Sequence, residues 1–236
     1  MNYVALAVSF FVLVVLYFLY TYMFVQASMV STPRSLRQDK RVTIDPAKLK
    51  FPNSSRYYYE AWIWIDDNTD ATNVLFDRLP FFAVTLKSST LTVYSQKTSG
   101  APADTDKTSG VLTTPDNSYN KVADITTAFP FQKWVQFVMN VDGSTVDLYL
   151  EGRLVKSQSG VSIGQDATTA INIGNPNTYG QIKNLIFQPV VTDPPGVWSR
   201  YAQTKGMAAL GTVSSAYNVD LTFLKDNANV GTLNLL

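Results

Sequence analysis

The chain has 236 residues, a formal net charge of +1, and neither cysteine nor histidine. These absences exclude a disulfide framework, cysteine-ligated metal sites and every catalytic triad that uses histidine. A domain without disulfides is also typical of a reducing compartment. Aromatic residues make up 13% of the chain and charged residues 16%, which favours β-strands and excludes a disordered chain.

The N-terminal run from residue 4 to residue 25 is apolar, uncharged and free of proline. A helix over this run would be about 33 Å long, which covers a bilayer core of about 30 Å. We therefore predict that residues 1–27 form a transmembrane anchor, which includes Val4, Phe11, Leu16 and Val25. The alternative is a signal peptide cleaved before Ser28. The run is longer than the apolar core of a signal peptide, however, and no basic residue precedes it.

A basic segment follows the predicted anchor. Residues 31–50 carry six basic and two acidic side chains, whereas the other residues carry 13 basic and 16 acidic ones. The positive-inside rule then places the C-terminal domain on the cytoplasmic side of the membrane. We interpret residues 28–55 as a tether with candidate lipid-headgroup contacts at Arg34, Arg37, Lys40 and Arg41. The remaining chain has no basic excess, so a nucleic-acid-binding domain is not indicated.

From residue 56 to residue 206 the chain alternates short apolar runs with turn residues, which predicts one all-β sandwich. Residues 57–65 are aromatic at both alternating positions, so we expect both faces of that strand to be buried. Asp142-Gly143-Ser144 predicts a tight hairpin, and residues 195–203 are predicted as a short helix. The expected core residues are Trp62, Trp64, Trp134 and Tyr149, with the last two facing the same sandwich interior.

Two segments lie outside this expected core. Residues 97–120 form a polar excursion, and residues 207–236 form a C-terminal extension that ends in two more strands. Because Leu233, Leu235 and Leu236 are apolar, the last strand should add to a sheet edge of its own sandwich or of a neighbour. We expect both segments to contact other proteins, since additions to a rigid scaffold vary without disturbing it.

Five motifs occur in the order found in laminin-G-like domains. They are YYYEAWIWID (57–66), FQKWVQFVMNVDG (131–143), VDLYLEGRLV (146–155), INIGN (171–175) and YGQIKNLIFQ (179–188). No single motif is specific, but in this order the chain resembles that family. The resemblance implies an antiparallel jelly-roll β-sandwich of the laminin-G-like, concanavalin A-like type, in which a short helix follows the last motif.

The sequence offers little for catalysis. Glycosidases of the concanavalin A-like superfamily need a pair of closely spaced carboxylates. The two glutamates, Glu60 and Glu151, each lack a carboxylate two to five residues away on a shared strand face. There is also no phosphate loop and no dinucleotide fingerprint. We therefore predict no catalytic residues, no cofactor and no enzymatic activity.

Two binding alternatives stay open at the residue level. Asp66, Asp67 and Asp70 form the densest oxygen cluster and are candidate calcium ligands, although a solvated loop is the favoured interpretation. Trp62, Trp64 and Trp134 would suit sugar stacking in a lectin, although core positions are favoured for them.

These features predict a non-enzymatic structural or interaction protein. Membrane-anchored laminin-G-like domains resemble minor capsid proteins of large DNA viruses with an internal membrane. That resemblance implies a virion protein that links the membrane to the capsid shell, with capsid proteins and the bilayer as partners. The main alternative is a membrane-anchored, glycan-binding lectin, whose domain would lie outside the cell. A membrane-anchored hydrolase is a weaker third hypothesis, because the catalytic groups are missing.

Overall fold

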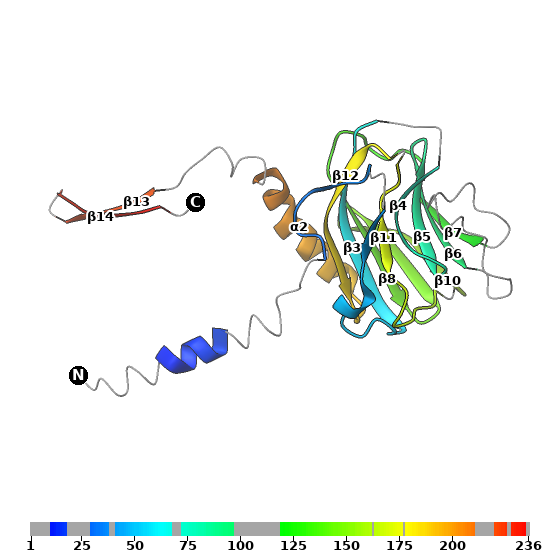
Figure 1. Cartoon of the computed structure of the whole chain (residues 1–236), viewed down its shortest axis with the longest axis horizontal. Coiled ribbons are helices and arrows are strands. Elements are labelled where there is room, and N and C mark those ends of the chain that lie inside the picture. The colour runs from blue at the N-terminus through cyan, green and yellow to red at the C-terminus, as the bar shows by residue number, and fades with distance from the viewer. Residues whose placement is uncertain are drawn as a thin grey trace.

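The computed structural model describes residues 10–17, 29–37, 41–67, 72–96, 119–161, 163–176, 178–210, 220–225 and 228–234. Within these ranges the chain folds as two six-stranded antiparallel sheets packed face to face, with one helix across the outer face of one sheet (Figure 1). This arrangement confirms the predicted all-β antiparallel sandwich.

The front sheet is the one that the helix covers. Its strand order is β1-β12-β3-β8-β9-β10. The strands are β1 (Arg34–Ser35), β3 (Arg56–Ile65), β8 (Val135–Asp142), β9 (Thr145–Leu150), β10 (Arg153–Ser159) and β12 (Gly180–Gln188). Gly143, with a φ of 60°, forms the predicted tight turn between β8 and β9.

The back sheet has the strand order β2-β11-β4-β5-β6-β7. Its strands are β2 (Val42–Ile44), β4 (Asn73–Arg78), β5 (Phe82–Lys87), β6 (Thr90–Gln96), β7 (Tyr119–Thr126) and β11 (Ile171–Ile173). Strand β7 begins where the predicted polar excursion ends, and residues 97–118 lie outside the described part of the chain.

The main core fills the space between the two sheets. Alternate residues of β3 point into it, and their rings pack against aromatic side chains of the back sheet. Tyr59 lies 5.1 Å from Phe82 and 6.4 Å from Phe76, measured between ring centroids. The other alternate residues of β3 face the helix, so both faces of this strand are buried, as its two-sided aromatic pattern predicts.

The helix α2 (Pro194–Leu210) follows β12 and is longer than the predicted 195–203. Asp193 caps its first turn, where the side-chain Oδ1 accepts a hydrogen bond from the Gly196 amide at 3.0 Å. Two prolines at the helix start suit positions whose amide groups have no intrahelical acceptor. Tyr58, Val138, Tyr149 and Val197 form a second apolar cluster between this helix and the front sheet.

The predicted tether needs correction, because much of residues 28–55 belongs to the sandwich. Strand β1 pairs with β12 on the front sheet, and β2 pairs with β11 on the back sheet. Val30 and Leu36 are buried in the main core, and Pro46–Lys48 forms a short 3-10 helix, η1. The sequence concealed these strands because they are only two and three residues long, too short to show an alternating apolar pattern.

The N-terminal segment is described only for residues 10–17, which are helical. Phe11 and Leu16 lie exposed on this helix, and Val4 and Val25 are outside the described residues. No helix among the described residues is long and apolar enough to cross a membrane. The transmembrane anchor therefore stays a prediction.

The C-terminal extension contains β13 (Asp220–Lys225) and β14 (Ala228–Asn234). These strands pair with each other and with no other described strand. The expectation that the last strand joins an edge of its own sandwich is therefore wrong for the described residues, Leu233 included. Leu235 and Leu236 lie outside them.

Candidate binding surface

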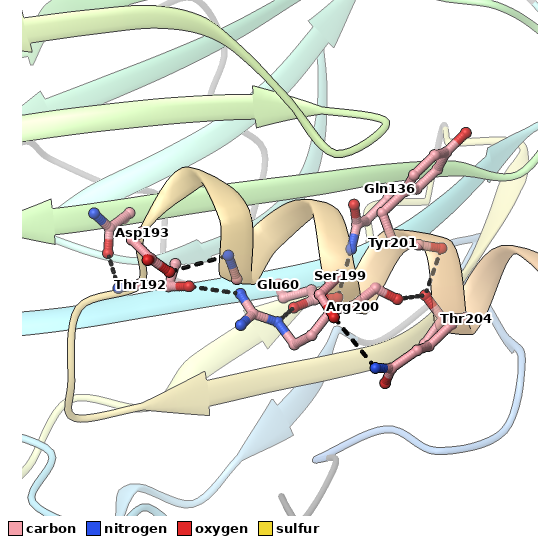
Figure 2. Close-up of polar contacts among 11 residues, drawn as sticks. Glu60, Gln136, Thr192, Asp193, Ser199, Arg200, Tyr201 and Thr204 are labelled. Carbon is pink, nitrogen blue, oxygen red and sulfur yellow. Dashed lines mark hydrogen bonds and ion pairs between the residues drawn. The ribbon is translucent and has the colours of Figure 1, made fainter.

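Glu60 is the centre of a buried polar network between the front sheet and α2 (Figure 2). Its Oε1 accepts a hydrogen bond from Gln136 Nε2 at 2.6 Å, and its Oε2 accepts one from Arg200 Nε at 2.7 Å. The Arg200 guanidinium also donates to Thr192 Oγ1 and lies over the Tyr58 ring. The network fixes α2 on the sheet and covers Glu60, whose side chain is 3% exposed.

Glu151, in the turn between β9 and β10, contacts the helix at Tyr201, the residue that follows Arg200. Its Oε1 accepts a hydrogen bond from the backbone amide of Gln136 at 3.1 Å, and its Oε2 accepts one from the Tyr201 hydroxyl at 3.1 Å. Lys133 Nζ adds an ion pair at 3.2 Å. Both glutamates therefore hold the fold together, whereas a glycosidase needs two carboxylates that reach a substrate.

Trp62 and Tyr149 are buried, but beneath α2. Trp62 stacks on Tyr201 with ring centroids 6.0 Å apart, and Tyr149 belongs to the apolar cluster under the helix. The prediction that Tyr149 faces the interior between the sheets is therefore wrong. Its position in β9 points it to the outer face of the front sheet, while Val146 and Leu148 point inward.

Trp64, Trp134 and Lys183 form a patch on the part of this outer face next to α2, which we call the indole patch. The Trp64 and Trp134 rings lie 5.9 Å apart, and Lys183 Nζ lies 4.2 Å from the Trp134 centroid. Burial lowers the pKa of Lys183. Both indoles are only half-buried, so the prediction that they are core residues is wrong. Strand register explains why the two rings meet. Ile63 pairs with Val135 in antiparallel strands, so Trp64, which follows Ile63, lies beside Trp134, which precedes Val135. Both tryptophans point to the face opposite to that of Ile63 and Val135.

Asp66 and Asp67, two of the three calcium candidates, follow Trp64 closely in the chain. Asp66 Oδ1 accepts a hydrogen bond from Trp64 Nε1 at 2.6 Å, so this carboxylate orients the indole. Asp67 follows it at the end of β3, and Asp70 is outside the described residues. The described residues contain no group of three or more acidic side chains that could hold a metal ion.

The basic residues predicted to meet lipid headgroups have different positions. Arg34 is in the edge strand β1, and the Arg37 guanidinium lies 4.6 Å from the Tyr179 ring centroid. Lys40 is outside the described residues. Arg41 pairs with the buried Asp77 and donates to the Gly174 carbonyl at 2.9 Å, so it stabilises the back sheet and is not available to a headgroup. Burial raises the pKa of Asp77, and Arg41 opposes that shift.

Sequence reasoning missed Arg78, which is fully buried at one end of the sandwich. Its guanidinium has neutral acceptors: the carbonyls of Pro52, Asp166 and Thr169, Gln165 Oε1 and the Tyr59 hydroxyl. Arg78 therefore joins two loops, residues 49–53 and 163–169, that are distant in sequence. No sequence motif marks such a residue, because its partners are mostly backbone carbonyls.

The fold and this surface define a lectin-type antiparallel sandwich whose two glutamates have structural roles. The chain belongs to the concanavalin A-like lectin/glucanases superfamily, whose family model matches residues 36–186. A search of curated protein sequences finds no significant match.

Solved structures share the fold at low sequence identity. One is the botulinum neurotoxin serotype D ligand binding domain in complex with N-acetylneuraminic acid. Its TM-score is 0.55 at 12% identity, over 75% of this chain and 44% of that one. A second is the receptor binding domain of botulinum neurotoxin D, with a TM-score of 0.54 at 11% identity, over 76% and 46%. A third is the binding domain of Paraclostridial Mosquitocidal Protein 1, with a TM-score of 0.50 at 12% identity, over 75% and 47%. This chain thus spans less than half the length of each.

Proposed function

We propose that this chain is a non-enzymatic interaction protein whose sandwich is held against a membrane by the N-terminal anchor. The observation that carries the proposal is how soon after the predicted anchor the described part of the chain joins the sandwich. The Met29 amide donates to the Leu185 carbonyl at 2.7 Å. The apolar run of the predicted anchor ends at Val25, and four extended residues span at most about 14 Å. The sandwich then lies directly beside the bilayer, with no long tether between them.

The carboxylates support a non-enzymatic role. Glu60 and Asp77 are buried in ion pairs with Arg200 and Arg41, and Glu151 accepts a hydrogen bond from Tyr201 of α2. A general acid and base must reach a substrate. With these groups engaged in the fold, the surface of the sandwich acts by contact.

The partner side of the proposal rests on the C-terminal hairpin. An isolated two-stranded hairpin is marginally stable in water and gains stability by packing on another element. Strands β13 and β14 pair with no other described strand. We propose that this hairpin docks on another protein of a membrane-associated assembly, and that the assembly is a viral capsid built around an internal membrane.

Cross-linking in the native membrane or particle tests this function. The chain has no cysteine, so a single cysteine can carry a photo-cross-linker at one position. Lys225→Cys in β13 should link to another protein, whereas Lys156→Cys on the exposed strand β10 is the matched control. Equal labelling from both positions, or none from position 225, would contradict the proposed docking role.

A second candidate, glycan binding, is favoured by the indole patch. Partly exposed aromatic rings with a nearby cation suit an acidic sugar, and one structure with this fold is a complex with N-acetylneuraminic acid. A glycan array with the wild-type chain and the Trp134→Ala variant tests it. The control is Trp198→Ala, which removes an exposed tryptophan on α2. Glycan binding that Trp134→Ala abolishes, together with no protein cross-links from position 225, would establish the lectin role instead.

A further inference from the structure

Phe51 is an apolar side chain presented to solvent at the tip of a loop. It is 73% exposed, and its φ of 48° lies in the left-handed region that residues with a side chain avoid. The Phe51 carbonyl accepts a hydrogen bond from the Ser54 amide at 3.1 Å, which closes a tight turn. Contacts with a partner would explain why the chain keeps an unfavourable backbone conformation that exposes a large apolar side chain.

This loop, residues 48–54, is held rigidly at both ends. Leu49 is buried in the main core on one side of Phe51. On the other side the Pro52 carbonyl accepts a hydrogen bond from the buried Arg78 Nη1 at 3.0 Å. Phe51 is therefore held outward between two fixed points. Lys48 and Lys50 precede it in the chain and are exposed, so the loop combines one aromatic ring with two basic side chains.

A second exposed apolar residue lies at the same end of the sandwich. Val190, which is 55% exposed, follows β12, where Gln188 pairs with Tyr58 near the start of β3. The 48–54 loop leads into that same start of β3, where Arg56 pairs with Asp142.

Three acidic side chains near this end make contacts within the fold. Asp142 forms an ion pair with Arg56, Asp45 accepts the Ala47 amide, and Asp193 accepts the Gly196 amide. Lys48 and Lys50 are exposed, and they bring positive charge to the loop itself.

The direction of the N-terminal segment connects this end to the predicted anchor. Val30 bridges to Leu185, and Ser35 pairs with Gln181, so the segment runs antiparallel to β12 and parallel to β3. The described part of this segment therefore starts, at Met29, from the side where β3 begins. Because the anchor is predicted to end within about 14 Å of Met29, that side of the sandwich is the one nearest the bilayer.

We propose that the 48–54 loop is a membrane contact, with Phe51 inserted at the bilayer interface and Lys48 and Lys50 beside anionic headgroups. Aromatic side chains favour the headgroup level of a membrane, and basic side chains near an anionic surface are attracted to it. The inference rests on the proposed membrane anchor. Arg41 was a predicted lipid contact, but it is engaged in an ion pair with Asp77. The proposed contact is instead the 48–54 loop, which projects outward.

Site-directed spin labelling of the full chain tests the contact. The label is placed by Phe51→Cys or Val190→Cys, and by Leu154→Cys as the matched control. Leu154 is also an exposed apolar residue, 47% exposed, but on β10 at the opposite edge of the front sheet. Each labelled chain is reconstituted into phosphatidylcholine vesicles with and without phosphatidylserine. Collision rates with oxygen, which concentrates in lipid, and with a water-soluble nickel chelate then report where each label lies.

The expected result is that the label at position 51 collides more with oxygen than with the chelate, and that phosphatidylserine increases this difference. The label at position 154 should show the reverse preference in both kinds of vesicle. A label at position 51 that is as accessible to the chelate as the label at position 154 overturns the proposal. A label shielded from both probes also overturns it, because a protein then covers the loop.

An alkaline carbonate wash separates this failure from that of the anchor. If the washed vesicles retain the chain while position 51 stays aqueous, the anchor stands and only the loop contact is wrong. If the wash releases the chain, both the anchor and the loop contact are wrong.

Discussion

The four tryptophans differ in what covers them, and this difference determines how much each contributes to stability. Trp62 is buried under α2, Trp64 and Trp134 are half-buried in the indole patch, and Trp198 is exposed on the helix. A tryptophan contributes most when its removal leaves a cavity that the surrounding structure cannot fill.

We expect Trp62→Ala to lower the free energy of unfolding by about 3–5 kcal/mol, the range for a buried aromatic residue. Trp134→Ala should cost only about 1–2 kcal/mol, because its ring is only partly buried. Urea denaturation followed by far-UV circular dichroism measures both. Equal losses for the two variants would show that α2 does not cover Trp62 in solution.

Arg200 and Glu60 form the ion pair on which the helix depends. Arg200→Met leaves the Glu60 carboxylate buried with Gln136 as its remaining side-chain donor. We expect a loss of about 2–3 kcal/mol, below the full value for a buried pair because the arginine is partly exposed. Adding Glu60→Gln should restore part of the loss, since it removes the unpaired charge. A double variant less stable than Arg200→Met alone would contradict this account.

The raised pKa of Tyr59 predicts how the stability of the fold changes at alkaline pH. Burial raises the pKa of Tyr59 from 10.0 to about 12, and burial raises the pKa of Tyr57 as well. Above pH 10 the unfolded chain releases these protons while the folded chain retains them, so unfolding becomes more favourable as the pH rises. The urea midpoint should therefore change little below pH 10 and fall as the pH approaches 12. Tyr59→Phe should reduce the slope of that fall, and an unchanged slope would disprove the assignment.

At the scale of elements, the contact of α2 with the β9–β10 turn depends on Gly152. Its φ is 77°, and a Cβ atom there would lie 2.9 Å from side-chain atoms of Trp198 and Tyr201. Gly143 in the β8–β9 turn has a φ of 60°, but a Cβ atom there would meet nothing within 4 Å. The two glycines therefore separate the backbone effect of a side chain from its effect on the helix.

Gly143→Ala should cost about 1 kcal/mol, the usual penalty for a side chain in the left-handed region. Gly152→Ala should cost about 2–3 kcal/mol, because overpacking against the helix adds to that penalty. It should also change the near-UV circular dichroism of Trp198 and Tyr201, whereas Gly143→Ala should not. Identical stability and spectra for the two variants would mean that α2 adjusts freely.

The short N-terminal strands decide where the domain begins. A chain starting at residue 56 would lack β1 and β2, which pair with β12 and β11 at the edges of both sheets. It would also lack Leu36, which is buried in the main core, and Arg41, which neutralises the buried Asp77. A folded domain therefore needs residues from about Met29 onward, since an unpaired buried carboxylate is strongly destabilising.

At the scale of the whole molecule, the sandwich and the C-terminal hairpin are separate sheets. Removing residues 211–236 should leave the urea midpoint of the sandwich unchanged, because no described strand of the sandwich pairs with β13 or β14. The same deletion should stop partner proteins from co-purifying with the chain from the native membrane. A lower midpoint after deletion would show that the hairpin packs on its own sandwich.

The sequence alone was sufficient for the fold class and for the strands with strong patterns. Alternating apolar residues and the Asp142-Gly143 turn are local features, so they predicted β3, β8 and β9 without any tertiary information. Strand β4 was missed, because its Asp77 and Arg78 interrupt the apolar pattern. Both charges are nevertheless buried, since Arg41 pairs with one and loop carbonyls surround the other. Their partners lie far away in the sequence.

The tertiary structure decided which aromatic faces are covered. Tyr58, Trp62 and Tyr149 are on the outer face of the front sheet, which a sequence pattern marks as solvent-facing unless another element packs there. The helix α2 packs over these residues and leaves Trp64 and Trp134 partly exposed beside it. A period of two residues along a strand determines which side chains share a face. It carries no information about which face a distant helix will bury, because that depends on contacts such as Arg200 with Glu60, 140 residues apart.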